Sequence, residues 1–191
     1  MDIQPSAIGN NWLVGVFALF HIVLVSMGGL APLVIFLAEG SALKRKDGDF
    51  RQVTKAFLTL ALEIAVIGGI LGSGLVVALI GLHPQVITLV INIFFWFVVL
   101  QLFCFIAGLA FQFVYYFSWD RPAGRHRLWG LIGAVLPLVP FVAFSAAAAF
   151  LNNPGSWPSS GNVWDAVLNP VTVPSLLHRV ATGIVLIGAF L

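Results

Sequence analysis

Five long apolar runs constrain this chain more than any other feature of its sequence. They cover residues 12–37, 56–82, 86–116, 128–151 and 173–191, and an α-helix needs about 20 apolar residues to cross a bilayer. Only 8% of the residues are charged, whereas about a quarter are charged in soluble domains. The sequence therefore predicts one all-α domain, a polytopic transmembrane helical bundle with four full spans and the start of a fifth.

The fifth run follows Pro170 and Pro174, which suit a loop or the first turn of a helix because proline lacks an amide donor. It continues to Leu191, where the sequence stops inside an apolar segment. Since natural proteins seldom end there, we expect either a truncated chain or a bundle that other membrane subunits complete.

Basic residues occur mainly in two of the connections between the runs. Residues 43–55 hold five lysines and arginines and residues 119–127 hold three, whereas the other two connections hold none. By the positive-inside rule the two basic loops are cytoplasmic and the N-terminus lies outside. Arg179 is the exception to this pattern. Because membrane topology explains the cations, the net charge of +2 gives no reason to expect nucleic acid as a partner.

Cysteine usage excludes several kinds of metal site. Cys104 is the single cysteine, and no C-x-x-C-H sequence is present. An intrachain disulfide, a cysteine-rich metal or iron–sulfur site and covalent c-type haem attachment are therefore excluded.

Four ionisable residues lie within the apolar runs: His21, Glu63, His178 and Arg179. Such residues are costly in hydrocarbon and are candidates for function. Neutral imidazole ligates iron, and helical bundles often bind cofactors between facing helices. With the predicted topology both histidines lie in the outer half of the bilayer. The simplest cofactor is haem b, with His21 and His178 as metal ligands.

Each of these residues also has a structural interpretation. His21 is equally explained by a hydrogen bond to a neighbouring helix. For His178 the haem interpretation is favoured, because Arg179 beside it offers a cation for a haem propionate, although Arg179 could instead snorkel to lipid headgroups. For Glu63 two alternatives remain open: it forms a structural hydrogen bond with a neighbouring helix, or it belongs to a proton path. Of the loop histidines, His83 is expected to face water.

His126 lies among arginines in the second basic loop. We expect it to belong to a solvated basic surface that meets lipid phosphates.

Several motifs in shared order resemble subunit I of the cytochrome bd quinol oxidases. The strongest is V-L-N-P at residues 167–170, followed by His178 and by V-A-T-G at 180–183. The stretch FHIVLVSMGGLAPLVIFLAE looks like the first helix of that family, and W-D-R at 119–121 and N-N-P-G at 152–155 fall at similar intervals. The resemblance spans nearly all of this chain but only the first half of a family subunit.

The resemblance implies an antiparallel helical bundle in a bacterial or archaeal cytoplasmic membrane. It implies that His21 ligates a haem of the oxygen-reducing pair, and that His178 ligates the low-spin haem b near the quinol site. The remaining haem ligands and the quinol-binding loop would lie beyond the end of this chain.

The chain departs from the family pattern in its third apolar run. The two glutamates of the family correspond to Leu100, beside Gln101, and to Gly108. Gln101 joins Glu63 as a candidate polar or proton-path residue. Because carboxylates deliver protons to reduced oxygen, their loss makes oxygen reduction by this chain doubtful.

The leading hypothesis is a haem-b-binding electron-transfer subunit of a cytochrome bd-like or other quinol-linked respiratory complex, with one or two haems and Arg179 as a propionate partner. Two alternatives remain open. The chain is either a membrane anchor that holds one haem between two histidines for a peripheral oxidoreductase, or a haem-free structural subunit that keeps the fold.

Overall fold

Helices joined by short turns and loops make up the part of the chain that the computed structural model describes. This part comprises residues 5–190, with side chains described for 12–189 except residue 123. The helices are α1 (Pro5–Arg45), α2 (Gly48–Leu82), α3 (Pro84–Phe117), α4 (Ala123–Val135), α5 (Leu138–Asn152), α6 (Trp157–Ser160), α7 (Val163–Val167) and α8 (Thr172–Phe190). No strand occurs in this range, and five segments are long and apolar enough to cross a membrane. The predicted fold class is confirmed; Leu191, the predicted end of the last span, lies outside the described residues.

The first two helices extend further than the apolar runs. α1 continues to Arg45 and α2 begins at Gly48, whereas the runs end at residue 37 and begin at residue 56. Lys46 turns the chain with a φ of 55°, and the carboxylate of Asp47 caps α2 by accepting from the Phe50 amide at 2.9 Å. The apolar runs mark the membrane segment, while lysine, arginine and glutamine continue the helices beyond it.

The fourth apolar run forms two helices rather than the single helix predicted. α4 ends at Val135 and α5 begins at Leu138, because Pro137 has no amide to donate to the preceding turn. The break packs against α3 at Gly108, where a Cβ atom would lie 3.1 Å from Cδ of Pro137. The short helices α6 and α7, which hydropathy does not reveal, follow α5 in the connection to α8.

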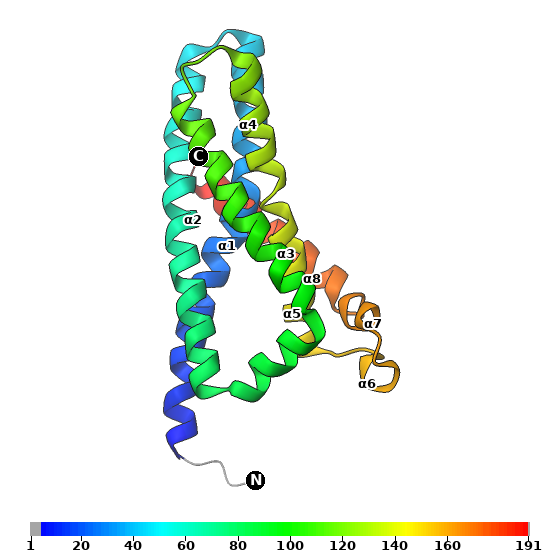
Figure 1. Cartoon of the computed structure of the whole chain (residues 1–191). Coiled ribbons are helices and arrows are strands. Elements are labelled where there is room, and N and C mark those ends of the chain that lie inside the picture. The colour runs from blue at the N-terminus through cyan, green and yellow to red at the C-terminus, as the bar shows by residue number, and fades with distance from the viewer. Residues whose placement is uncertain (1–4, 191) are drawn as a thin grey trace.

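The spans alternate in direction, as the charge pattern predicts. Figure 1 shows the α1–α2 and α3–α4 turns at one end of the bundle, and the α2–α3 turn with α6 and α7 at the other. The end that carries both basic loops is called the basic end here. That the basic end faces the cytoplasm stays a prediction.

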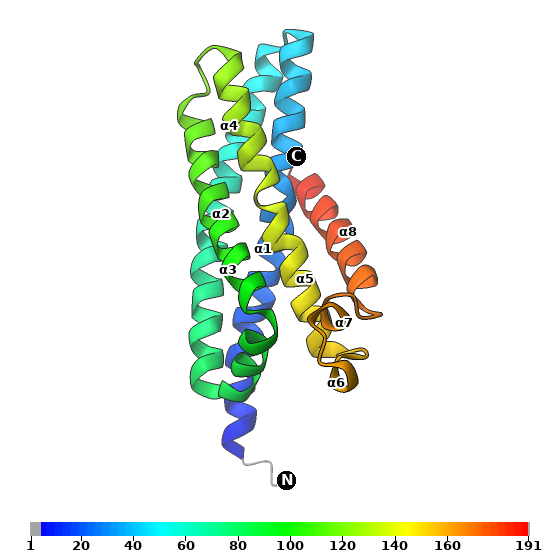
Figure 2. The same ribbon diagram turned by 45° about the vertical axis from the view of Figure 1, so that its right-hand side comes forward.

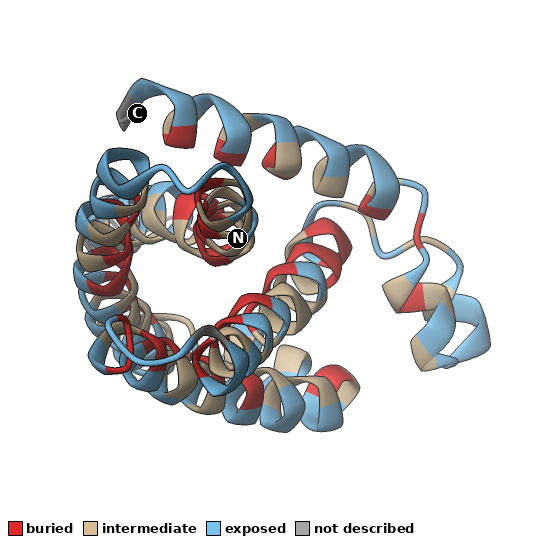
Figure 3. Cartoon of the chain, turned by 90° about the horizontal axis from the view of Figure 1, so that it is seen from above, coloured by how far each residue is buried: buried red, intermediate tan, exposed pale blue. Residues whose placement is uncertain are grey.

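The main core lies between α1 and α2, which pack along much of their length (Figure 1). Buried side chains of both helices meet there, among them Ile35, Leu58 and Ala61. Tyr115 and Trp119 close this core at the basic end, and Ile187 of α8 covers it from the side. In the end-on view of Figure 3, the buried residues of α8 lie along the side that faces the bundle.

α8 crosses the bundle obliquely and packs against α1 and α5 (Figure 2). The closest approach is at Gly183, where a Cβ atom would lie 2.5 Å from the backbone oxygen of Ser26 and 2.7 Å from Cδ1 of Leu30. The backbones can approach so closely only because glycine has no side chain. This glycine therefore fixes where α8 sits.

Gly183→Ala is expected to destabilise the bundle by about 1–3 kcal/mol, because the added methyl group overlaps the Ser26 carbonyl. Gly188→Ala on the same helix is the matched control, since nothing lies within 4 Å of its Cβ position. The midpoint of unfolding in detergent, followed by circular dichroism, measures both. Equal midpoints for the two variants would contradict this packing.

The orientation is testable with single-cysteine variants in a Cys104→Ser background. Lys44, at the basic end, and Ser159, in α6 at the other end, are both exposed. A membrane-impermeant maleimide should label Ser159→Cys in intact cells, and Lys44→Cys only after lysis. The reverse pattern would show that the N-terminus is cytoplasmic.

Candidate functional site

Polar residues of α8 gather on one side of its first turns. Ser175, His178, Arg179 and Thr182 are spaced three and four residues apart, so they share a helix face. This face borders a groove of about 410 Å³, here called the α8 groove. Its other walls come from α1 and α5, through Ile22, Ser26, Ala148, Ala149 and Asn152.

An asparagine turn positions this polar face. Asn169 is buried, and its side chain donates to the Ala166 carbonyl at 2.8 Å and accepts from the Val171 amide at 2.9 Å. The turn joins α7 to the start of α8, and Pro174 occupies the first turn of that helix, where a missing amide costs nothing. The V-L-N-P sequence thus sets the position from which the polar face projects.

His178 presents its imidazole to the groove. The residue is exposed, and its ring forms no hydrogen bond with any residue in the described part of the chain. A free imidazole can offer a lone pair to a metal. The exposed ring of His178 is therefore chemically able to ligate a metal in the groove.

Arg179 points inward beside it. Its side chain is 9% exposed and its Cζ atom lies 5.3 Å from the centre of the Phe144 ring. Among the described residues it forms neither an ion pair nor a hydrogen bond. Arg179 borders the groove that His178 also borders. Snorkelling to lipid headgroups stays an open alternative for this side chain.

His21 is held by a hydrogen bond to α2. Its Nδ1 atom lies 2.9 Å from the Gly68 carbonyl, and since a carbonyl only accepts, Nδ1 carries the proton and Nε2 keeps a lone pair. The ring fits because Gly72 has no Cβ, which would lie 2.6 Å from Cε1 of His21. The ring of Phe144 packs against the imidazole in a T-shaped arrangement, with 5.8 Å between the two ring centres. Both interpretations of His21 are compatible with this geometry.

The two histidines lie in different surroundings. His178 lines the α8 groove and His21 does not, although its neighbour Ile22 does. Phe144 contacts both parts of the site. Its ring packs against His21 and also against the guanidinium of Arg179, the residue that follows His178. The arrangement favours separate ligands over one iron shared by both.

The other candidate polar residues stand apart from this cluster. Glu63 is exposed on α2 and Gln101 is half-buried on α3, and neither forms a side-chain hydrogen bond with another described residue. Gln112, which the sequence did not single out, is buried with its Oε1 atom unpaired. No chain of hydrogen bonds links these residues into a proton path within the described range.

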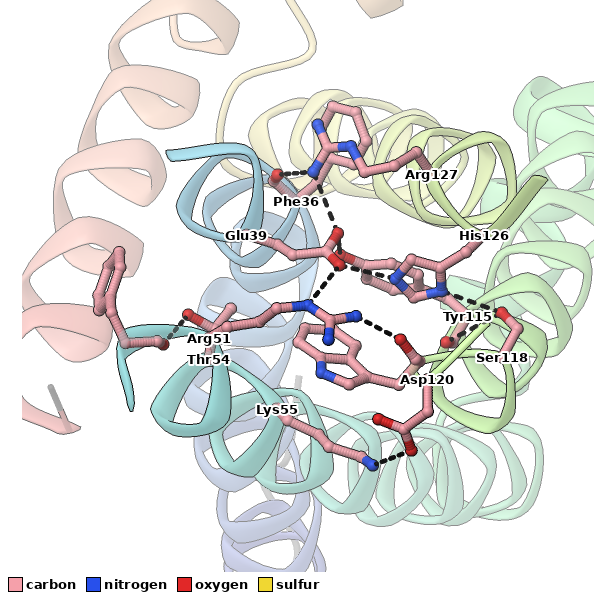
Figure 4. A network of polar contacts seen from close by, with 12 residues as sticks. Phe36, Glu39, Arg51, Thr54, Lys55, Tyr115, Ser118, Asp120, His126 and Arg127 are labelled. Carbon is pink, nitrogen blue, oxygen red and sulfur yellow. Dashed lines mark hydrogen bonds and ion pairs between the residues drawn. The ribbon is translucent and has the colours of Figure 1, made fainter. Parts of the chain in front are cut away.

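The largest polar cluster lies at the basic end and centres on Glu39 (Figure 4). The Glu39 carboxylate is fully buried. One oxygen lies 2.7 Å from Nε2 of His126 and 3.5 Å from Nε of Arg51. The other accepts from the Tyr115 hydroxyl at 2.6 Å and from Arg127 at 3.1 Å. One carboxylate thus joins α1, α2, α3 and α4.

Outer contacts fix the partners of Glu39. Ser118 lies 3.1 Å from Nδ1 of His126. Arg51 donates to the Trp119 carbonyl and lies over its indole, and Arg127 donates to the Phe36 carbonyl at 2.9 Å. Lys55 and Asp120 form an exposed ion pair beside the cluster at 3.2 Å.

The expected position of His126 was wrong. Rather than meeting lipid phosphates, it is 1% exposed and stacks on Tyr115 with ring centres 4.6 Å apart. A buried carboxylate needs cationic or hydrogen-bonding partners, and the basic loops supply them. The signal in the sequence was an acid at the end of an apolar run, with two basic loops at the same end.

The contacts of the Glu39 cluster indicate a structural role. Both carboxylate oxygens are already engaged by two partners each, which leaves no position open for a metal. No group of three or more His, Cys, Asp or Glu residues suited to a metal ion occurs in the described chain. The α8 groove, with its unengaged imidazole and guanidinium, is therefore the better candidate for a binding site.

Glu39→Gln is expected to lower the free energy of unfolding by about 3–5 kcal/mol, because it leaves the partly buried Arg51 and Arg127 without the buried carboxylate that compensates their charge. Glu63→Gln is the control, since Glu63 is exposed and forms no hydrogen bond in the described chain. Denaturant titration of the purified protein, followed by tryptophan fluorescence, compares them. A Glu39→Gln variant as stable as Glu63→Gln would contradict the structural role of the Glu39 cluster.

The chain matches no protein-family model, and neither a curated protein nor a solved structure is significantly similar to it.

Proposed function

We propose that this multi-pass membrane chain is a haem-b-binding subunit that carries electrons within a quinol-linked respiratory complex. The observation that carries the proposal is His178, an exposed imidazole without a hydrogen-bond partner in the described chain, beside a buried cation on one groove. The ordered motifs that resemble subunit I of the cytochrome bd quinol oxidases support it. By that resemblance the membrane is the cytoplasmic membrane of a bacterium or archaeon.

Haem b, when bound, supplies a one-electron couple. His178 would bind its iron, and the turn built by Asn169 holds the start of α8 from which His178 projects. Ile22, Ala148 and Ala149 supply apolar walls on one side of the groove, and a bound haem would pack its apolar ring against them.

His21 would ligate a second haem. Its Nδ1–H group donates to the Gly68 carbonyl, which fixes the ring and makes Nε2 a better donor to a metal. Gly72 and Phe144 hold the ring in that orientation from two sides. The hydrogen bond that satisfies the half-buried His21 side chain would also prepare it as a ligand.

Oxygen reduction is not part of the proposal. One of the positions at which the family has glutamate is Gly108, and a Cβ atom there would lie 3.1 Å from Pro137. The other is Leu100, which is half exposed. The packing of α3 on the α4–α5 break thus leaves no room for a carboxylate at Gly108, and proton delivery to oxygen would need other groups.

A second candidate is a subunit that binds one haem through His178 alone. The hydrogen bond from His21 to Gly68 favours it, since this bond is sufficient to explain a half-buried histidine. The ratio of haem to chain separates the two candidates.

The test is the reduced-minus-oxidised absorption spectrum of the protein purified from its native membrane. His178→Ala is expected to abolish the low-spin haem b band, and His21→Ala to remove about half of the total haem if two haems are bound. His83→Ala, at the α2–α3 turn, is the control and should leave the spectrum unchanged. A wild-type protein without haem bands, or a His178→Ala spectrum equal to that of the control, would refute the proposal.

A further inference from the structure

Arg179 is a buried cation without a counter-ion in the described part of the chain. Its side chain is 9% exposed, and the ion pairs that the structure contains all lie at the basic end. Phe144 is its aromatic neighbour, with 5.3 Å between Cζ and the ring centre. Cation–π contact offsets only part of the cost of removing a guanidinium from water. A negative charge is needed to complete the site.

The guanidinium remains open to the α8 groove. Its nitrogens are not among the fully enclosed polar atoms that lack a partner, which in the described chain are Nε of Arg51 and Oε1 of Gln112. Arg179 also borders the groove directly. A ligand in the groove would therefore reach the cation without any movement of α8.

The groove offers hydrogen-bond donors and lacks carboxylates. The hydroxyls of Ser26 and Thr182 already donate to carbonyls of their own helices, at 2.7 and 2.9 Å. Asn152 likewise donates to Ala148 at 3.0 Å. Among the lining residues, the hydroxyl of Ser175, the guanidinium of Arg179 and the ring N–H of His178 remain as uncommitted donors. A ligand that satisfies them must accept hydrogen bonds, and the charge of Arg179 favours an anion.

The remaining walls indicate that the ligand is amphiphilic. Ile22, Ala148 and Ala149 supply an apolar surface, and the small alanines leave the space that the groove occupies. Arg179 is seven residues into α8, about 10 Å along the helix. A ligand with an apolar body and an acidic head fits both features, since its body lies among the helices while its head meets the cation.

We infer that the α8 groove binds the acidic head group, a carboxylate or a phosphate, of an amphiphilic ligand, with Arg179 as its counter-ion. The inference deepens the proposed function and rests on it only for the identity of the ligand. If haem b occupies the groove, the head group is a propionate. If a membrane lipid does, it is a phosphate.

The test uses iron-free protoporphyrin IX, which has two carboxylates but forms no iron–histidine bond, and its uncharged dimethyl ester. Fluorescence titration of the full-length protein in neutral detergent measures both affinities. The diacid is expected to bind at least tenfold more tightly than the ester, since a hydrogen bond to a charged group contributes that much. Arg179→Gln should abolish this preference and Arg179→Lys should keep most of it.

Arg121→Gln is the matched control, because Arg121 is exposed at the basic end and does not line the groove. It should preserve the preference for the diacid. Equal binding of diacid and ester by the wild type, or a preference that survives Arg179→Gln, would overturn the inference. Circular dichroism of each variant shows that lost binding does not reflect lost folding.

A competition experiment in nanodiscs identifies the source of the head group. If phosphatidylglycerol displaces the diacid from the wild type and phosphatidylcholine does not, the site accepts a lipid phosphate; if neither displaces it, the site is selective for carboxylate. Both results support an acidic head group at Arg179. Absence of haem from the native protein, with an intact diacid preference, would refute the proposed function and leave this inference standing.

Discussion

The fold depends on one buried carboxylate. Glu39 of α1 forms hydrogen bonds with groups on α3 and α4 and an ion pair with Arg51 of α2, so the four helices are joined at a single point of the basic end (Figure 4). In an apolar medium side chains gain little from burial alone, since lipid is as apolar as the core. A carboxylate that loses one of its cations there leaves a charge without compensation. The cluster therefore specifies which helices meet and in what register.

The α8 groove lies away from the Glu39 cluster along the bundle and depends on different contacts. Asn169 sets the start of α8, Gly183 sets its crossing with α1, and the polar face lies between these two points. The Glu39 cluster joins α1, α2, α3 and α4, and α8 packs against this bundle through α1 and α5. The bundle thus supports a groove in which the side chains of His178 and Arg179 form no hydrogen bond within the described chain, as a binding site requires.

The sequence was sufficient to predict the helical class, the number of spans and their alternation, because apolar run length and loop charge are local properties. The predicted end of α1 came too early and the predicted start of α2 too late. A helix continues past the hydrocarbon when the residues that follow favour helix. The break at Pro137 was not predicted, although the proline was visible, because prolines in membrane helices often only kink them.

The candidate site could be predicted only in part. His178, Arg179 and the Asn169 turn are adjacent in sequence, and their shared place on α8 follows from helical spacing. The hydrogen bond of His21 to Gly68 and the burial of Arg179 against Phe144 depend on tertiary packing. The Glu39 cluster joins residues up to 88 positions apart, so spacing gave no sign of it. For this reason His126 was mistaken for a surface residue.

The central claim is that the imidazole of His178 is an iron ligand. A cryo-EM map of the complex isolated from its native membrane tests it most directly. The account predicts planar, porphyrin-shaped density joined to the His178 ring, with the head group of that density against Arg179. Lipid density in the groove, with the His178 ring bonded to nothing but water or a neighbouring side chain, would contradict it.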